Sequence, residues 1–156
     1  MNYTTALVQL PLVCEPGKQK IVSPADAYNL CRDIENLAQE TFFVVTLNTR
    51  NALLNRHLVS LGVVDSTLVQ PREVFRAAIQ DGTAAAVLLL HNHPSGETQP
   101  STDDLRITRQ LVDAGKIIGI KVLDHIIIGR AIQPMGDQPG QPAFLSLRES
   151  GLVTFE

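Results

Sequence analysis

The stretch "LLLHNHPSGETQPSTDD", residues 88–104, decides the fold around it. The apolar run 83–93, which contains the three leucines, predicts a central strand that is covered on both faces. The prolines and the glycine of residues 94–100 predict a loop. Ser101 then fits a helix N-cap, with Asp104 three residues later in a capping-box-like position. Strand, loop and helix together bring two histidines at a strand end close to the first turn of a helix.

Working outward, hydrophobic periodicity predicts further helices and strands on both sides of this stretch. Ser23 and Pro24 predict a helix start, and Gly115 a helix end. The predicted helices span residues 24–39, 71–82 and 101–114, and the predicted strands span residues 6–13, 41–48, 52–64, 83–93 and 116–129, with a bend or bulge at Gly119. Residues 130–142 read as a surface loop, and residues 143–156 as a strand plus a short tail. This order predicts an α+β fold, with a mixed, mostly antiparallel β-sheet flanked by helices.

Length and composition describe an ordinary globular chain. Its 156 residues, 44% apolar and 19% charged, suit one domain, which we place at 21–156 after an N-terminal extension of residues 1–20. The net charge of -3 and the absence of a dense Lys/Arg cluster argue against direct nucleic-acid binding. No apolar run is long enough for a membrane span, and Cys14 and Cys31 suggest no disulfide framework, so we expect a cytoplasmic protein. Cys31 should pack as a small hydrophobe.

The histidines of the opening stretch predict a metal site. His91 and His93 are two residues apart on a strand, so their side chains point to the same face. Asp104, in the first turn of the next helix, can reach back to the strand end. Two histidines and one carboxylate, with a fourth position left to water, form the open arrangement of catalytic zinc.

Simpler interpretations of the same residues stay open. An H-x-H pair is often surface or core histidine, Asp103 and Asp104 could only complement a helix N-terminus, and Ser101 could only be a cap. His57 is expected to be exposed. His125, after Asp124, is either part of a pair that orients a ligand or, as we favour, a satisfied core residue.

The full spacing, H-x-H-P-x(6)-S-x-x-D, resembles the JAMM motif of the MPN+ (JAB) metallopeptidase family. It comprises His91, His93, Pro94, Ser101 and Asp104. The strings "HNHPSG" and, downstream, "DHIIIG" are similar to the RadC branch, and the resemblance covers about residues 20–150. It implies the cytidine-deaminase-like MPN/JAB fold.

The resemblance also implies a role for each matching residue. His91, His93 and Asp104 match the zinc ligands, and Ser101 matches a serine that polarises the scissile carbonyl or steadies the oxyanion. Glu40, just before a strand, matches the general base, whereas the rivals Glu35 and Glu73 fit exposed helix faces. Glu97 is a plausible substrate contact.

The implied activity is zinc-dependent hydrolysis of a peptide or isopeptide bond in a protein or peptide substrate. The alternative is a RadC-type DNA-repair or mobile-element accessory protein that acts through binding. Long members of that branch usually carry a helix-hairpin-helix segment before this domain, for which residues 1–20 are too short. An HNH nuclease is set aside, because its motif letters are spread over a ββα unit. Residues 5–13 could supply an edge through which copies of the chain form a homo-oligomer.

Overall fold

The computed structural model describes residues 19–62, 69–133 and 140–156. Their elements, in chain order, are α1 (Pro24–Leu30), the 3₁₀ helix η1 (Arg32–Ile34), β1 (Thr41–Leu47), β2 (Leu53–Leu61), α2 (Pro71–Gln80), β3 (Ala86–Asn92), α3 (Thr102–Ile118), β4 (Lys121–Ile128) and β5 (Phe144–Ser146). This is an α+β fold, as the sequence predicts.

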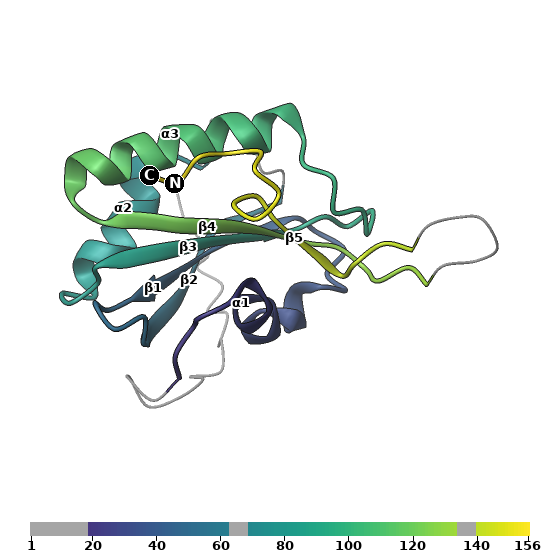
Figure 1. Ribbon diagram of the computed structural model, residues 1–156, viewed down its shortest axis with the longest axis horizontal. Coiled ribbons are helices and arrows are strands. Elements are labelled where there is room, and N and C mark those ends of the chain that lie inside the picture. The colour runs from purple at the N-terminus through teal and green to yellow at the C-terminus, as the bar shows by residue number, and fades with distance from the viewer. Residues whose placement is uncertain (1–18, 63–68, 134–139) are drawn as a thin grey trace, which may run out of the picture.

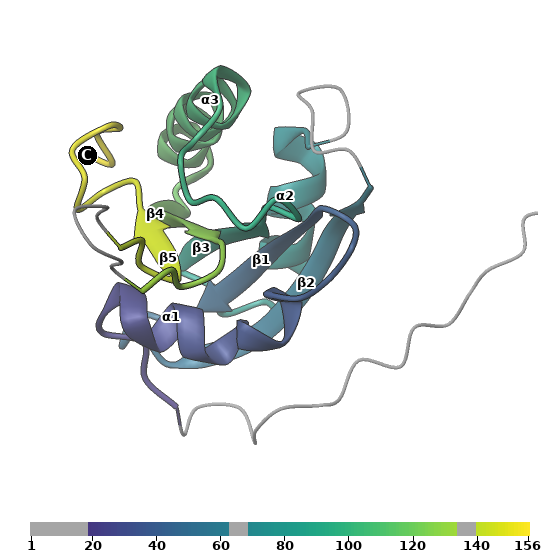
Figure 2. The same cartoon turned by 90° about the vertical axis from the view of Figure 1, so that its right-hand side faces the viewer.

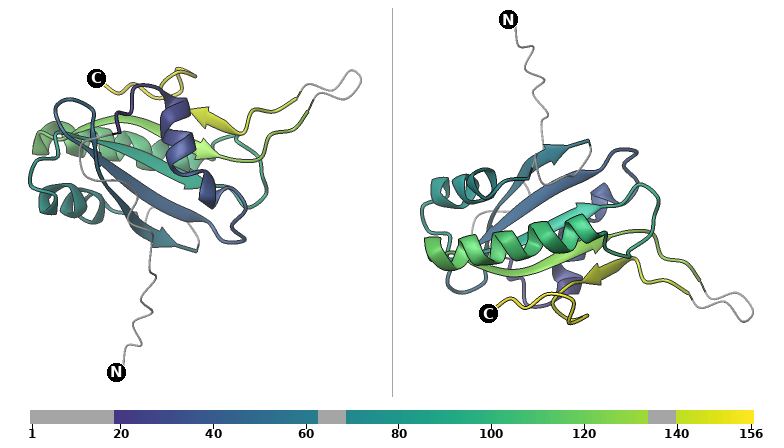
Figure 3. Two further views of the ribbon diagram at one scale, coloured as in Figure 1. Left: turned by 90° about the horizontal axis from the view of Figure 1, so that it is seen from below. Right: turned by 90° about the horizontal axis from the view of Figure 1, so that it is seen from above.

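The described strands form one five-stranded sheet in the order β2-β1-β3-β4-β5. The pair β3–β4 is parallel, and the pairs β1–β2, β1–β3 and β4–β5 are antiparallel. Helices α2 and α3 cover one face of the sheet and α1 crosses the other (Figures 1 and 2). Figure 3 shows the same layers from below and above, with α3 lying along the sheet. The mixed, mostly antiparallel sheet with β3 at its centre confirms the predicted arrangement.

Side chains that alternate along the central strands pack into two hydrophobic cores, one on each face of the sheet. Every residue of β1 and β3 is buried, as expected for strands covered on both faces. Val87 and Leu89 pack with α2 and α3, whereas Leu88 and Leu90 pack against α1. Continuing this alternation by one step turns His91 toward α3 and Asn92 toward α1.

The first helix is shorter than predicted. It ends at Leu30, because Cys31 leaves the helical region at φ -115° and ψ 17°, and a single 3₁₀ turn follows. Apolar spacing continues to Leu37, but that side chain is 38% exposed and gains no core contact that would extend the helix. Glu35 therefore lies beyond the helix, and its carboxylate accepts a hydrogen bond from the Tyr28 hydroxyl. Cys31 is fully buried as predicted, and burial raises the pKa of its thiol to about 12.

The third helix is longer than predicted, because Gly115 does not end it. Helix α3 continues to Ile118 and ends at Gly119, whose φ of 82° favours glycine. Gly115 is instead a close-packing position, since a Cβ there would lie 2.6 Å from the Ile120 carbonyl oxygen. The predicted bulge at Gly119 is accordingly wrong, and β4 begins only at Lys121.

Some predictions fall outside the described residues. These are the edge strand at residues 6–13, the pairing edge at residues 5–13 and the end of the second predicted strand at residues 63–64. Among the described helices, none is both long enough and apolar enough to cross a membrane.

Candidate metal centre

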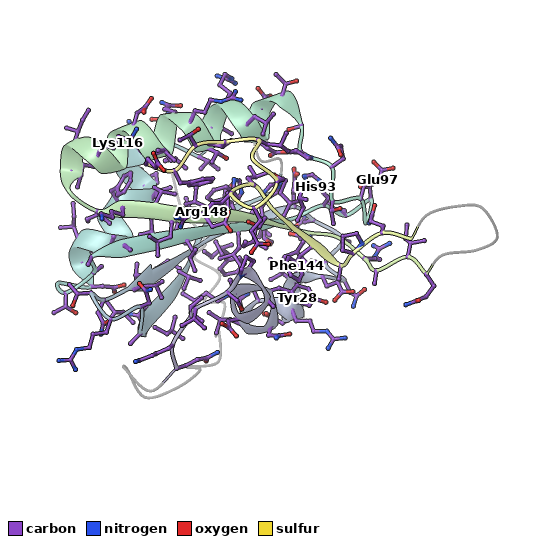
Figure 4. The ribbon with its side chains drawn as sticks, viewed as in Figure 1. Tyr28, His93, Glu97, Lys116, Phe144 and Arg148 are labelled. Carbon is purple, nitrogen blue, oxygen red and sulfur yellow. The ribbon has the colours of Figure 1, made fainter. Side chains whose placement is uncertain are left out.

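Three elements meet at one end of the sheet and bring the predicted site residues together. His91 is the second-to-last residue of β3, His93 follows that strand, Glu40 precedes β1, and Ser101 and Asp104 lie at the start of α3. In Figure 4, His93 and Glu97 lie at this end, beside the base of the projecting arm formed by residues 129–133 and 140–143.

The two histidines present the same ring nitrogen to a shared space. Nε2 of His91 lies 2.8 Å from Nε2 of His93. The Nδ1 atom of His93 donates to the carbonyl oxygen of Glu97 at 2.9 Å. A neutral imidazole carries one proton, so this bond leaves the lone pair of His93 on Nε2. That is the form of histidine that binds a metal.

Asp104 faces both imidazoles from the first turn of α3. Its Oδ1 lies 3.2 Å from His91 Nε2, and its Oδ2 lies 3.5 Å from His93 Nε2. The capping box fixes this carboxylate, because both the backbone N–H and the hydroxyl of Ser101 donate to Oδ2 at 2.7 Å. The Ser101 hydroxyl in turn accepts from the Asp104 backbone N–H. Ser101 therefore both caps the helix and holds Asp104, and its predicted role at a scissile carbonyl stays a prediction.

The charges of the site favour an ionised carboxylate. Burial opposes ionisation of Asp104, but the adjacent imidazoles of His91 and His93 and the hydrogen bond from Ser101 outweigh it and hold the pKa of the carboxyl far below its usual range. Burial likewise opposes protonation of His93, but the hydrogen bond and charge of Asp104 outweigh it and raise the pKa of that imidazole. The site is thus built around a fixed negative charge, as a cation-binding centre requires.

Glu40 stands at the edge of this cluster. Its Oε1 lies 3.9 Å from His93 Nε2, and its side chain is 24% exposed, against 4% for Asp104. Glu40, His91 and His93 each offer one ligand atom within 4.8 Å of the others. The donor set of two imidazole nitrogens and carboxylate oxygens fits zinc. Asp104 is held by its capping box and buried, whereas Glu40 is partly open to solvent.

Comparison with known families agrees with this geometry. The family model described as "RadC-like JAB domain" matches residues 21–151. The chain belongs to the RadC-like JAB domain family. The predicted resemblance to the RadC branch is thereby confirmed.

Similar proteins come from both bacteria and archaea. A UPF0758 protein of Rubrobacter xylanophilus is 42% identical over 146 residues, which cover 93% of this chain and 59% of the relative. One from Caldanaerobacter subterraneus is 43% identical over 137 residues, covering 87% of this chain and 54% of the relative. One from Methanosarcina barkeri is 37% identical over 146 residues, covering 93% and 58%. This chain therefore spans less than two thirds of the length of these relatives, and their names specify no reaction.

The loop after His93 is fastened to the arm of the RadC-like JAB domain. The Gly96 carbonyl oxygen accepts from the Arg130 backbone N–H at 2.7 Å and from Gln141 Nε2 at 2.8 Å. Gly129 is needed for this approach, since a Cβ there would lie 2.3 Å from the Gly96 carbonyl oxygen. The loop in turn supplies the Glu97 carbonyl that orients His93, so the arm supports the site.

Asn92, between the two histidines, fastens the segment that carries Glu40. It is fully buried on the α1 face. Its Oδ1 accepts from both the backbone N–H and the hydroxyl of Thr41, at 2.8 and 2.7 Å, and its Nδ2 donates to the Gln39 carbonyl at 3.1 Å. The side chain therefore binds the backbone on both sides of Glu40. Sequence reasoning missed this role, for which the signal was a polar residue at an inward strand position.

Asn92→Leu is expected to destabilise the fold strongly. Leucine has a similar volume but leaves the buried N–H and hydroxyl of Thr41 without their acceptor, at about 1–3 kcal/mol each. The free energy of unfolding, measured in urea, should fall by about 2–5 kcal/mol. The matched control Asn36→Leu, at an exposed position, should change it by less than about 0.5 kcal/mol. Equal stability of the two variants would show that the hydrogen bonds of Asn92 do not stabilise the fold.

His125 is the satisfied core residue that we favoured, and it also contacts a candidate metal ligand. His125 is fully buried with both ring nitrogens partnered, as a core residue should be, yet one partner is His91 Nδ1 at 2.8 Å. Burial, with the neighbouring His91, holds its pKa well below the usual value. Asp124 takes no part in this contact, since its carboxylate accepts from Ser146 and from backbone N–H groups.

The prediction that His57 is exposed is wrong. Its side chain is 29% exposed, and its Nε2 lies 2.8 Å from Asp81 Oδ2. The reason is that Asp81, at the C-cap of α2, lies against β2 and pairs with His57. This pair contains neither of the histidines of the candidate metal centre.

Proposed function

We propose that this chain is a zinc-dependent hydrolase that cleaves a peptide or isopeptide bond. The observation that carries the proposal is the convergence of His91 Nε2, His93 Nε2 and the Asp104 carboxylate, with the Glu40 carboxylate beside them. Zinc, when bound, would supply Lewis acidity that acidifies water and polarises a carbonyl oxygen.

His91, His93 and Asp104 would hold the ion. Glu40 would take a proton from the attacking water as the carbon–oxygen bond forms, and would return it to the leaving nitrogen as the carbon–nitrogen bond breaks. The exposure of Glu40 supports this role, because a proton carrier must reach both water and substrate. The Ser101 hydroxyl would steady the developing oxyanion only if it turned away from Asp104.

The first test is metal content. Protein purified without chelator, or titrated with zinc after chelator treatment, should hold about one zinc ion per chain. His91→Ala should abolish this binding, whereas His57→Ala, a matched histidine change outside the site, should keep it. A wild-type chain that takes up no zinc would overturn the proposal.

The second test is substrate cleavage. A zinc-loaded sample should cut members of an unbiased library of peptides and of isopeptide-linked peptides, and the cut should need zinc. Zinc binding without any cleavage would favour the alternative, in which the chain acts as an accessory protein through binding.

A further inference from the structure

A line of buried hydrogen bonds leads from the ring of His91 back to α3. His91 Nδ1 lies 2.8 Å from His125 Nε2, and His125 Nδ1 lies 2.6 Å from Thr108 Oγ1. The Thr108 hydroxyl lies 2.6 Å from the Asp104 carbonyl oxygen. His91, His125 and Thr108 are fully buried, and Asp104 is 3% exposed. These groups are therefore shielded from bulk water and take their hydrogen-bond partners from one another.

The chemistry of the groups gives every bond in this line a direction. A carbonyl oxygen only accepts, so the single hydroxyl proton of Thr108 goes to Asp104. Thr108 Oγ1 must then accept from His125, which places the His125 proton on Nδ1. Nε2 of the neutral His125 ring is consequently an acceptor, so His91 Nδ1 donates to it. The proton of His91 is thus on Nδ1, and its Nε2 lone pair faces the site.

We propose that Thr108 is a positioning residue that, through His125, fixes the tautomer of His91 and keeps its Nε2 lone pair free for a cation. The inference deepens the proposed function and rests on it, because a free lone pair serves metal binding. Asp104 lies at both ends of this line of hydrogen bonds. Its backbone carbonyl accepts from Thr108, and its carboxylate lies 3.2 Å from His91 Nε2. Helix α3 therefore positions the Asp104 carboxylate directly and, through Thr108, fixes the tautomer of His91.

A purely structural role for Thr108 makes a different prediction. Threonine hydroxyls in helices often bond the carbonyl four residues earlier, whatever surrounds them. In that case the tautomer of His91 would not depend on Thr108, and only stability would change when the hydroxyl is removed. The tautomer itself is therefore the decisive measurement.

Nitrogen-15 NMR of the histidine rings reads the tautomer directly in the metal-free protein. At about pH 8, where an ordinary histidine is neutral, wild-type His91 and His125 should both carry the proton on Nδ1. In Thr108→Val, of the same shape but without an acceptor, His125 should move its proton to Nε2 and donate to His91. His91 should then carry its proton on Nε2, and zinc affinity should fall about 10–100-fold.

Two further variants complete the design. Thr108→Ser keeps the hydroxyl and should restore both the wild-type tautomers and the zinc affinity. Thr102→Val, the same change at an exposed position of the same helix, should alter neither. A wild-type His91 protonated on Nε2, or tautomers unchanged in Thr108→Val, would overturn the inference. If Thr108→Val fails to fold, a wild-type His91 that carries its proton on Nε2 still overturns the inference.

The outcomes separate this inference from the proposed function. Wild-type tautomers as expected, in a chain that takes up no zinc, would leave the line of hydrogen bonds standing and refute the metal site. Zinc binding by a chain whose metal-free His91 carries its proton on Nε2 would do the reverse.

Discussion

Glu40→Gln is expected to lower the rate of hydrolysis by about 10²–10⁴-fold while zinc content stays near the wild-type level. Glutamine has the same shape as glutamate but cannot take a proton. Its amide should keep the position of the side chain, because the backbone on both sides is held. Asn92 binds Gln39 and Thr41, and the Gly62 N–H donates to the Glu40 carbonyl at 2.8 Å. The loss should therefore appear in kcat rather than in metal binding.

The measurement is a peptide-cleavage rate together with zinc analysis of the same samples. Glu73→Gln, a change of the same kind on α2, should leave the rate unchanged. If Glu40→Gln keeps most of the wild-type rate, Glu40 is not the proton carrier. If instead it loses zinc, Glu40 is a ligand, which the 4.8 Å grouping of Glu40 with the two histidines would then explain.

The candidate site was predictable because its parts are local in the chain. Strand alternation alone puts His91 and His93 on one face. The capping box alone, between residues only three apart, puts the Asp104 carboxylate at the start of α3. One short loop then joins the two pieces, so little depends on the rest of the fold. Glu40 was different, because only the resemblance to a known family pointed to it.

The supporting contacts were not predictable, because they join distant segments. Asn92 binds Thr41 across 51 residues of chain, and His91 meets His125 across 34. The sequence does hold a weak signal for the contact between Thr108 and Asp104. Thr108 lies four residues after Asp104, so both occupy the same face of a helix. Only the parallel pairing of β3 with β4, which sets Leu89 opposite His125, brings the ring of His125 to that face.

The errors in helix length have a common physical origin. Apolar spacing predicts where a helix could continue, and glycine predicts where it could stop, but tertiary contacts decide both. Leu37 has the spacing of a helix and lies exposed, so α1 ends early. Gly115 has the composition of a helix end and lies buried against Phe75 and the Ile120 carbonyl, so α3 continues past it. In both cases packing overrides local preference.

Asp104→Asn is expected to weaken zinc binding by more than about 100-fold, beyond the loss typical of residues that only support a ligand. Asparagine retains an oxygen that can accept from Ser101, so the capping box and the fold should persist, as circular dichroism can check. What is lost is the charge that faces both imidazoles. Zinc titration of the chelator-treated protein measures the effect.

Asp103→Asn is the matched control, because the two aspartates are neighbours in the first turn of α3 and differ in surroundings. Asp103 is half exposed and pairs with Arg106 at 2.8 Å, whereas Asp104 is buried against His91. A carboxylate that only complements a helix N-terminus contributes about 0.3–1 kcal/mol, a factor of roughly 2–5 in an equilibrium constant. If both variants weaken zinc binding by such a small and similar factor, helix-end electrostatics explains Asp104. A loss above 100-fold in Asp104→Asn alone requires that its carboxylate contact the ion.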